Sequence, residues 1–194
     1  LQGISLRDIE LTVRDPRGKR IVTQEGDMIF THFGISGPAA LRASQFVVKA
    51  KKKFGVDHVL LTIDMFPGES VDGLRERLAG IVRDEPKKAA KNAFRALTQE
   101  RLLLFLLERT GISPDAQADS IPRPSLQALA EAFKRFELWA SGTLSIEEAF
   151  VTGGGVHLKE VDPKTMHSKL TAGLFFCGEI LDVHGYTGGY NITA

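Results

Sequence analysis

The chain has 194 residues, of which 43% are hydrophobic and 25% are charged, a composition typical of one globular domain or two small ones. Its 25 Lys and Arg nearly balance its 24 Asp and Glu, which argues against a nucleic acid or an anionic membrane as its partner. The single cysteine excludes an internal disulfide, and no apolar run approaches the roughly 18 residues of a membrane-spanning helix. We expect a cytoplasmic protein, and because the chain starts at Leu1 without a leader, a segment of a longer one.

Residues 1 to about 66 show the patterns of short β-strands. Ile9–Val13 alternates apolar and polar residues, Asp15–Gly18 has turn chemistry, and Arg20–Val22 would return as the hairpin partner. Phe46–Val48 and His58–Ile63 are further candidate strands, rich in β-branched residues. Several short strands separated by turns predict a small barrel or sandwich. The basic cluster that follows Val48, residues 49–53, is interpreted as a solvated turn and not as a binding patch.

A short helix of about two turns is predicted to begin at Pro38, which lacks the N–H that would have no partner there. Ser36 or Gly37 would cap it. His32 and Ser36 are candidate reactive groups, because free N–H groups at a helix start favour anions. The alternative, which the residues alone favour, is that Ser36 only caps the helix and His32 is a hydrogen-bonded loop residue.

From Pro67 the apolar spacing becomes helical. Helices are predicted over residues 71–82, from an N-cap at Thr98 to a stop at Gly111, and over Ser125 to about Phe136. Their leucines would form the core of a helical subdomain; a stripe that binds a partner is the alternative. The β-pattern returns at residues 136–144, where Trp139 is expected to be a core residue on a strand. The helical block, about 68–135, is therefore an excursion from the β-domain.

Three consecutive glycines, Gly153, Gly154 and Gly155, indicate either a hinge or a close approach of backbone. They do not make a dinucleotide fingerprint, because the sixth position of that pattern is Leu158. The sequence also lacks a Walker A motif, zinc-spaced Cys and His, HExxH and a nucleophile elbow, so no metal site is predicted.

The last stretch carries the main candidate site. Leu174–Cys177 reads as a short buried strand with a structural thiol at Cys177; Glu179 and Asp182 follow it, and then comes a glycine-rich turn. Carboxylates placed directly after such a strand lie where open α/β sheets contact ligands. We interpret this stretch as half of a cofactor site. The alternative role for the two carboxylates is capping of a helix or turn.

Four motifs in one order resemble the BaiN/YhiN-type flavoproteins, bacterial FAD-binding proteins described as NAD(P)/FAD-dependent oxidoreductases. They are Met28–Pro38, Thr152–Val156, Thr165–Lys169, and Gly178-Glu179 through Asp182 to Gly188–Asn191. The resemblance implies an α+β fold: a small β-barrel-like domain with an inserted helical subdomain, plus a partial Rossmann-type FAD-domain segment. Residues 1–148 would be the insert, with barrel parts at about 1–67 and 136–148 and a helical lobe at about 68–135. Residues 149–194 would return to the FAD-binding domain.

The resemblance also implies a site and an activity. Gly178, Glu179, Asp182, Gly188, Gly189, Tyr190 and Asn191 would contact FAD, the carboxylates near the ribityl chain or pyrophosphate and the glycine turn at the pyrimidine edge. His32 and Gly153–Gly155 are candidates for the substrate cavity. NAD(P)H or an organic substrate would exchange hydride with the flavin. The alternative is a non-catalytic interaction module of a flavoprotein. The N-terminal dinucleotide fingerprint is absent from these residues, so the isolated chain is expected to bind no flavin and to be inactive.

Overall fold

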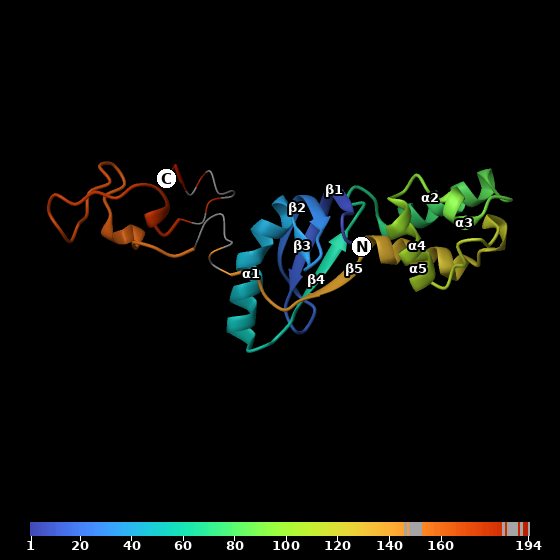
Figure 1. Cartoon of the computed structure of the whole chain (residues 1–194), viewed down its shortest axis with the longest axis horizontal. Coiled ribbons are helices and arrows are strands. Elements are labelled where there is room, and N and C mark those ends of the chain that lie inside the picture. Colours follow the sequence, from blue (N-terminus) through green and yellow to red (C-terminus); the bar gives the residue numbers. More distant parts are fainter. Residues whose placement is uncertain (146, 148–152, 184, 186–189, 191, 194) are drawn as a thin grey trace. The chain divides into compact units, whose positions relative to one another are not determined.

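The computed structural model describes residues 1–194 except 146, 148–152, 184, 186–189, 191 and 194. The chain divides into two compact units, Leu1–Ser141 and Gly142–Ala194, which are described one at a time. The first unit holds the named strands and α-helices (Figure 1). In chain order they are β1 (Ser5–Arg14), β2 (Arg20–Phe30), β3 (Ile35–Ser36), α1 (Pro38–Phe54), β4 (Val59–Asp64), α2 (Val71–Asp84), α3 (Ala90–Ala93), α4 (Glu100–Arg109), the 3₁₀ turn η1 (Ala118–Ser120), α5 (Arg123–Lys134) and β5 (Phe136–Ala140).

The strands form one antiparallel sheet in the order β3-β2-β1-β4-β5, curled into a half-barrel. The predicted hairpin is confirmed: β1 pairs with β2, and Asp15 Oδ1 accepts the backbone N–H groups of Arg17 and Lys19 in the turn. The register of this pair shifts between Leu6 and Ile9, where Asp8 has φ 50°. Such a bulge bends the strand, which promotes the curl.

Helix α1 corrects two predictions. It is 17 residues long instead of two turns, and it contains Phe46–Val48, which were predicted as a strand. The residues 49–53 predicted as a turn form its last turn. Tertiary packing explains the difference, because the helix buries one face at helical spacing against the strands. The buried members of that face are Ala39, Ala43, Val47 and Ala50.

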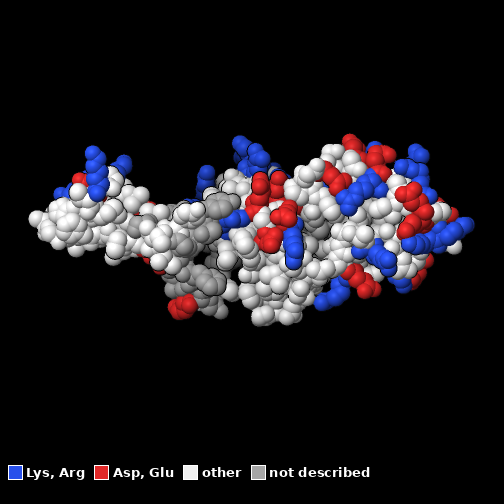
Figure 2. Space-filling model, turned by 90° about the horizontal axis from the view of Figure 1, so that it is seen from above, with Lys and Arg blue, Asp and Glu red and all other residues white. Residues whose placement is uncertain are grey.

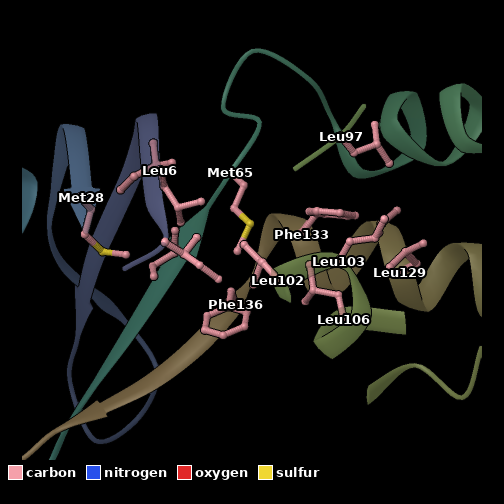
Figure 3. Close-up of a cluster of buried hydrophobic side chains, with 14 of the residues drawn as sticks. Leu6, Met28, Met65, Leu97, Leu102, Leu103, Leu106, Leu129, Phe133 and Phe136 are labelled. Carbon is pink, nitrogen blue, oxygen red and sulfur yellow. The ribbon is translucent and has the colours of Figure 1, made fainter. Parts of the chain in front are cut away.

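Helices α2 to α5 lie between β4 and β5 in the chain, yet those two strands are neighbours in the sheet. The predicted helices of this block are present; Gln99, instead of Thr98, occupies the N-cap position of α4 and makes no side-chain capping hydrogen bond. The helices and the strands share one hydrophobic core. Figure 3 shows Met65, Leu102 and Phe136 where the two groups of elements meet. The ring of Phe136 lies 6.0 Å from that of Phe30 in β2 and 5.9 Å from that of Phe105 in α4.

Trp139 is on strand β5 as predicted, but it is 65% exposed and not a core residue. Period-2 alternation explains this result. Phe136 is buried and Leu138 packs against the core, so Trp139 shares the opposite face with Glu137.

An ion pair connects the end of β4 to the end of α5. Lys134 Nζ lies 2.6 Å from Asp64 Oδ2, with only 10% and 20% of the two side chains exposed. The same ammonium group donates to the carbonyl of Phe66 at 2.7 Å and to that of Glu69. Asp64 also accepts the Phe66 N–H, at 2.9 Å. The pair therefore fixes the chain where it leaves the sheet for the helices.

Lys134→Met is expected to lower the free energy of unfolding by about 2–3 kcal/mol, because it leaves the half-buried Asp64 carboxylate without its cation. Chemical denaturation measures this change. Lys88→Met removes an exposed pair with Glu85 and is the matched control, expected to cost about 0.5 kcal/mol or less. Equal losses in the two variants would contradict this role for Lys134.

Charge is unevenly distributed over the sheet. Figure 2 shows acidic side chains gathered over the strands, while Lys and Arg are interspersed with acids over the helices. Asp8, Glu10 and Glu25 line a shallow pocket at the β1 bulge. Strand β1 thus carries Asp8 and Glu10 beside this pocket, with Arg7 next to Asp8 in sequence, and Arg14 at its other end.

Candidate functional site

In the second unit the structure brings together two segments that the sequence singled out separately. Val156 and Leu181 form a parallel bridge. Val156 N donates to Ile180 O at 2.8 Å, and Asp182 N donates to Val156 O at 3.1 Å. The glycine run therefore pairs with the segment that carries Glu179 and Asp182. Both of these acids are half-buried.

Gly155 is where this pairing depends on the absence of a side chain. A Cβ added there would lie 2.3 Å from Ile180 O and 2.8 Å from the carbonyl carbon of Leu181. Of the two predicted alternatives, a hinge or a close approach of backbone, the structure has a close approach at this residue. Gly154 differs, because an added Cβ would meet nothing within 4 Å. Gly153 is exposed.

The candidate flavin-contacting residues begin in a 3₁₀ turn, η4 (Gly178–Ile180). Gly178 has φ 72°, and a Cβ on it would lie 3.0 Å from Ile192 O. Leu181 N donates to Gly178 O at 3.1 Å and closes the turn. Glu179 thus lies within a tight turn and Asp182 directly after the bridged residue. Tyr190 is 64% exposed. Gly188, Gly189 and Asn191 lie outside the described residues.

The motif at residues 165–169 organises a loop. Ser168 is 5% exposed, and its Oγ accepts the N–H groups of Leu170 and Thr171 at 3.2 and 3.1 Å. His167 Nε2 accepts the Gly173 N–H at 2.9 Å, so the neutral ring carries its proton on Nδ1. Its ring lies 5.0 Å from that of Phe175. A second 3₁₀ turn, η3 (Leu158–Glu160), is tied to this loop by Lys169 N, which donates to Glu160 O.

The predicted buried strand at residues 174–177 is wrong. Phe175 makes only an isolated bridge to His167, and Cys177 is exposed. The physical reason is that a buried strand needs hydrogen-bonded neighbours and a covering layer. Among the described residues of this unit, the buried apolar side chains are those of Val161 and Leu181. Many others are exposed: Leu144, Leu158, Leu170, Leu174, Phe175, Ile180, Tyr190 and Ile192.

The other predicted reactive residues lie in the first unit. His32 is exposed in the loop between β2 and β3, with its ring 4.9 Å from that of Phe33. Ser36 is in β3 and does not cap α1. Gly37 occupies the cap position with φ 98°, and a Cβ there would lie 3.0 Å from Asp27 O. Among the residues that the structure describes, none makes a contact that would activate His32 or Ser36.

The sequence reading missed a cavity at the opposite end of β1 from the bulge. It has a volume of about 180 Å³, and its lining includes Arg14, Phe54, His58 and Trp139. Strand alternation could have indicated it, because Trp139 lies two residues after Glu137 and therefore on the same, polar face of β5. His32 lines neither this cavity nor the acidic pocket.

The described residues include no group of three or more His, Cys, Asp or Glu side chains arranged to hold a metal ion. None of the described helices has both the length and the apolar character needed to cross a bilayer.

Comparison with known proteins identifies the family. Residues 1–151 match the HI0933-like protein barrel and H2TH domain. The chain is 33% identical over 191 residues to a ribosomal RNA dihydrouridine synthase of Haemophilus influenzae, covering 98% of the chain and 43% of that protein. It is 28% identical over 165 residues to the Escherichia coli protein of the same name, covering 85% of the chain and 38% of that protein. A 3-dehydro-bile acid delta(4,6)-reductase of Clostridium scindens is 27% identical over 176 residues, covering 90% of the chain and 42% of that protein.

The chain spans less than half the length of each of these relatives. The family match nevertheless covers more than half of the chain, and the relative from Haemophilus influenzae matches nearly all of it. The half-barrel with its helices is the architecture that the family description names. The chain therefore belongs to the HI0933-like family, the BaiN/YhiN-type flavoproteins, which are FAD-dependent oxidoreductases.

Proposed function

We propose that residues 1–148 are the insert domain and residues 149–194 the returning FAD-domain segment of an FAD-dependent oxidoreductase. The observation that carries this proposal is the parallel pairing of Val156 with Leu181, which places Gly155 against the segment with Glu179 and Asp182. Rossmann-type sheets are built mostly from parallel strands. The exposed apolar side chains of the second unit fit a segment that packs against further chain.

The chain's own residues would bind and orient the cofactor. The carboxylates of Glu179 and Asp182 are acceptors for ribityl hydroxyls, and the bare backbone at Gly155 and Gly178 allows close approach at the turn that holds them. The turn at Gly188, Gly189, Tyr190 and Asn191 would direct N–H groups toward the pyrimidine edge of the ring. FAD, when bound, supplies the hydride-transfer chemistry. The insert would cover the flavin and shape the substrate cavity, with His32 and Gly153–Gly155 as its candidate lining.

The names of the relatives narrow the substrate class. A dihydrouridine synthase and a delta(4,6)-reductase both concern a carbon–carbon double bond conjugated to a carbonyl group. We propose that the protein reduces such a bond, with NAD(P)H as the source of electrons. Ribosomal RNA and a small unsaturated ketone are the two candidate kinds of substrate. The prediction from net charge, that nucleic acid is not a partner, conflicts with the first candidate.

A second candidate function is a non-catalytic interaction module. It is favoured by the same exposed apolar side chains, among them Leu170 at 74% and Phe175 at 61%. Except for Leu144, these side chains lie beyond residue 148. Specific capture of a partner protein by the 194-residue chain, but not by residues 1–148, would support the module, and the absence of capture by either supports the oxidoreductase.

The full-length protein is expected to purify yellow, and NADH or NADPH should bleach its visible flavin absorption under anaerobic conditions. The 194-residue chain is the matched control, and in equilibrium dialysis it is expected to take up no FAD, because its residues include no dinucleotide fingerprint. A colourless full-length protein that takes up no added FAD would refute the proposed function. Tight uptake of FAD by the 194-residue chain would refute the assignment of residues 149–194 as half a site.

A further inference from the structure

One end of the first unit carries a concentration of positive charge that the total composition conceals. The β1–β2 turn and the last turn of α1 lie at this end, together with the start of β4 and the end of β5 (Figure 1). Residues 14–20 and 49–58 contain eight Lys and Arg against two Asp, whereas the whole chain has 25 against 24. We call residues 14–20, 49–58 and Trp139 the basic end. Lys51 Nζ connects its two sides by donating to the carbonyl of Ser141.

The positive charge is only weakly neutralised within this end. The carboxylate of Asp15 is occupied by two backbone N–H groups of the turn. Arg14 is held by Nε donating to Thr62 Oγ1 at 3.0 Å and Nη1 donating to Gly18 O at 3.0 Å. Burial lowers the pKa of Arg14, and the charges of Arg135 and Arg20 lower it further, against the opposing effect of Glu137. Glu137 is itself paired with Arg135 at 2.9 Å. Arg14 therefore sits in a positive field that an anion would relieve.

Aromatic surface lies directly beside these cations. Trp139 is 65% exposed and lines the 180 Å³ cavity together with Arg14, Phe54 and His58. Lys53 Nζ lies 5.3 Å from the centre of the Phe54 ring. An exposed indole that shares a cavity with an arginine, with lysines at the end of the neighbouring helix, suits single-stranded nucleic acids, because bases stack on aromatic rings while cations contact phosphates.

We propose that the basic end binds single-stranded RNA, with a base stacked on Trp139 and phosphates contacted by Arg14 and by the lysines that end α1. The choice of RNA among polyanions rests on the proposed function, for which ribosomal RNA is a candidate substrate. The near-zero net charge does not oppose binding, because the field at a surface depends on the local charges. The prediction from composition that nucleic acid is not a partner is thereby put to a direct test.

Trp139 is the only tryptophan of the chain, so its fluorescence reports on this surface alone. A uridine-rich single-stranded RNA of about a dozen nucleotides, the length bound by one or two stacking modules, is titrated into the 194-residue chain. Saturable quenching of Trp139 is expected. Contact with about four phosphates predicts that raising salt from about 50 to about 200 mM weakens binding about 50-fold. No quenching, or quenching that salt leaves unchanged, would overturn the proposal.

Variants separate stacking from charge, with anisotropy of labelled RNA as the measurement. Trp139→Ala is expected to weaken binding about tenfold to a hundredfold, and Trp139→Phe to restore part of it. Lys52→Ala with Lys53→Ala, both exposed, should reduce the salt dependence. Lys87→Ala with Lys88→Ala, in the loop after α2, is the matched control and should leave binding unchanged. An equal loss of RNA affinity in the two double-lysine variants, or an equal affinity for dextran sulfate, would show nonspecific electrostatic binding and refute the site.

The flavin test does not involve this surface, so the two proposals fail separately. A yellow full-length protein combined with no RNA binding refutes only the RNA site. RNA binding that quenches Trp139, combined with a colourless full-length protein that takes up no FAD, refutes only the proposed oxidoreductase.

Discussion

Gly155→Ala is expected to break the pairing of the glycine run with the segment that carries Glu179 and Asp182. The added Cβ would lie 2.3 Å from Ile180 O and 2.8 Å from the Leu181 carbonyl carbon. Both obstacles are backbone atoms, so no side-chain rotation relieves the clash, and one of the two segments must move. The Val156 N–Ile180 O and Asp182 N–Val156 O hydrogen bonds would then be lost. In the 194-residue chain, hydrogen exchange of the Val156 and Asp182 amides should rise at least tenfold.

In the full-length protein the same substitution is expected to reduce bound flavin to a small fraction of the wild-type content, because the proposed carboxylate contacts depend on this pairing. Gly154→Ala is the neighbouring control. It has φ 96° and no atom within 4 Å of an added Cβ, so it introduces backbone strain of about 1–2 kcal/mol without a clash. Retention of flavin by Gly155→Ala, together with protected amides at Val156 and Asp182, would contradict the proposed site.

Local patterns were enough to predict most elements of the first unit. Alternation and turn residues predicted β1, β4, β5 and the first three residues of β2, and helical spacing predicted α2, α4 and α5. The failure at α1 has a specific cause. Phe46–Val48 has strand propensity over three residues, but the alanines around it have helical spacing over three turns, and burial of that longer face decides the structure.

The second unit shows where sequence reasoning stops. The pattern at residues 174–177 has the hydrophobicity of a buried strand, but within the described chain Phe175 finds only one bridge partner and Cys177 is exposed. A hydrophobic pattern predicts that a segment will be buried, but it does not show which element of the protein buries it. In the same way the glycine run predicted close backbone approach, while its partner at Ile180 could not be predicted, because backbone pairing leaves no side-chain pattern.

The basic end of the first unit is the other feature that the sequence analysis missed. The net charge of the whole sequence adds the cations of the hairpin turn and of α1 to the acids of the β1 bulge, so that they largely cancel. The fold separates them, because Asp8, Glu10 and Glu25 line the pocket at the β1 bulge, whereas Arg14 and the end of α1 line the other cavity. Only the chain path shows that two basic segments some 30 residues apart in sequence share one surface.

Phe133→Ala is expected to lower the free energy of unfolding of the first unit by about 3–5 kcal/mol, a large part of the stability of an ordinary domain. Phe133 is fully buried in α5 (Figure 3). Its ring lies 5.4 Å from that of Phe66, and its carbonyl accepts the Met65 N–H at 3.0 Å. Truncation leaves a cavity where the helices meet the strands. The melting temperature should fall by about 10–20 °C.

Phe105→Ala removes the same side chain from a site that is 38% exposed, and is expected to cost about 1–2 kcal/mol. Two probes then test whether the sheet and the helices unfold together. Trp139 fluorescence reports on β5, and far-ultraviolet circular dichroism reports mainly on the helices. Because strands and helices share one hydrophobic core, both transitions should move together in Phe133→Ala. A variant whose helical signal is lost at a lower temperature than its Trp139 signal would show that α2 to α5 form a separately stable lobe, and would contradict a single core.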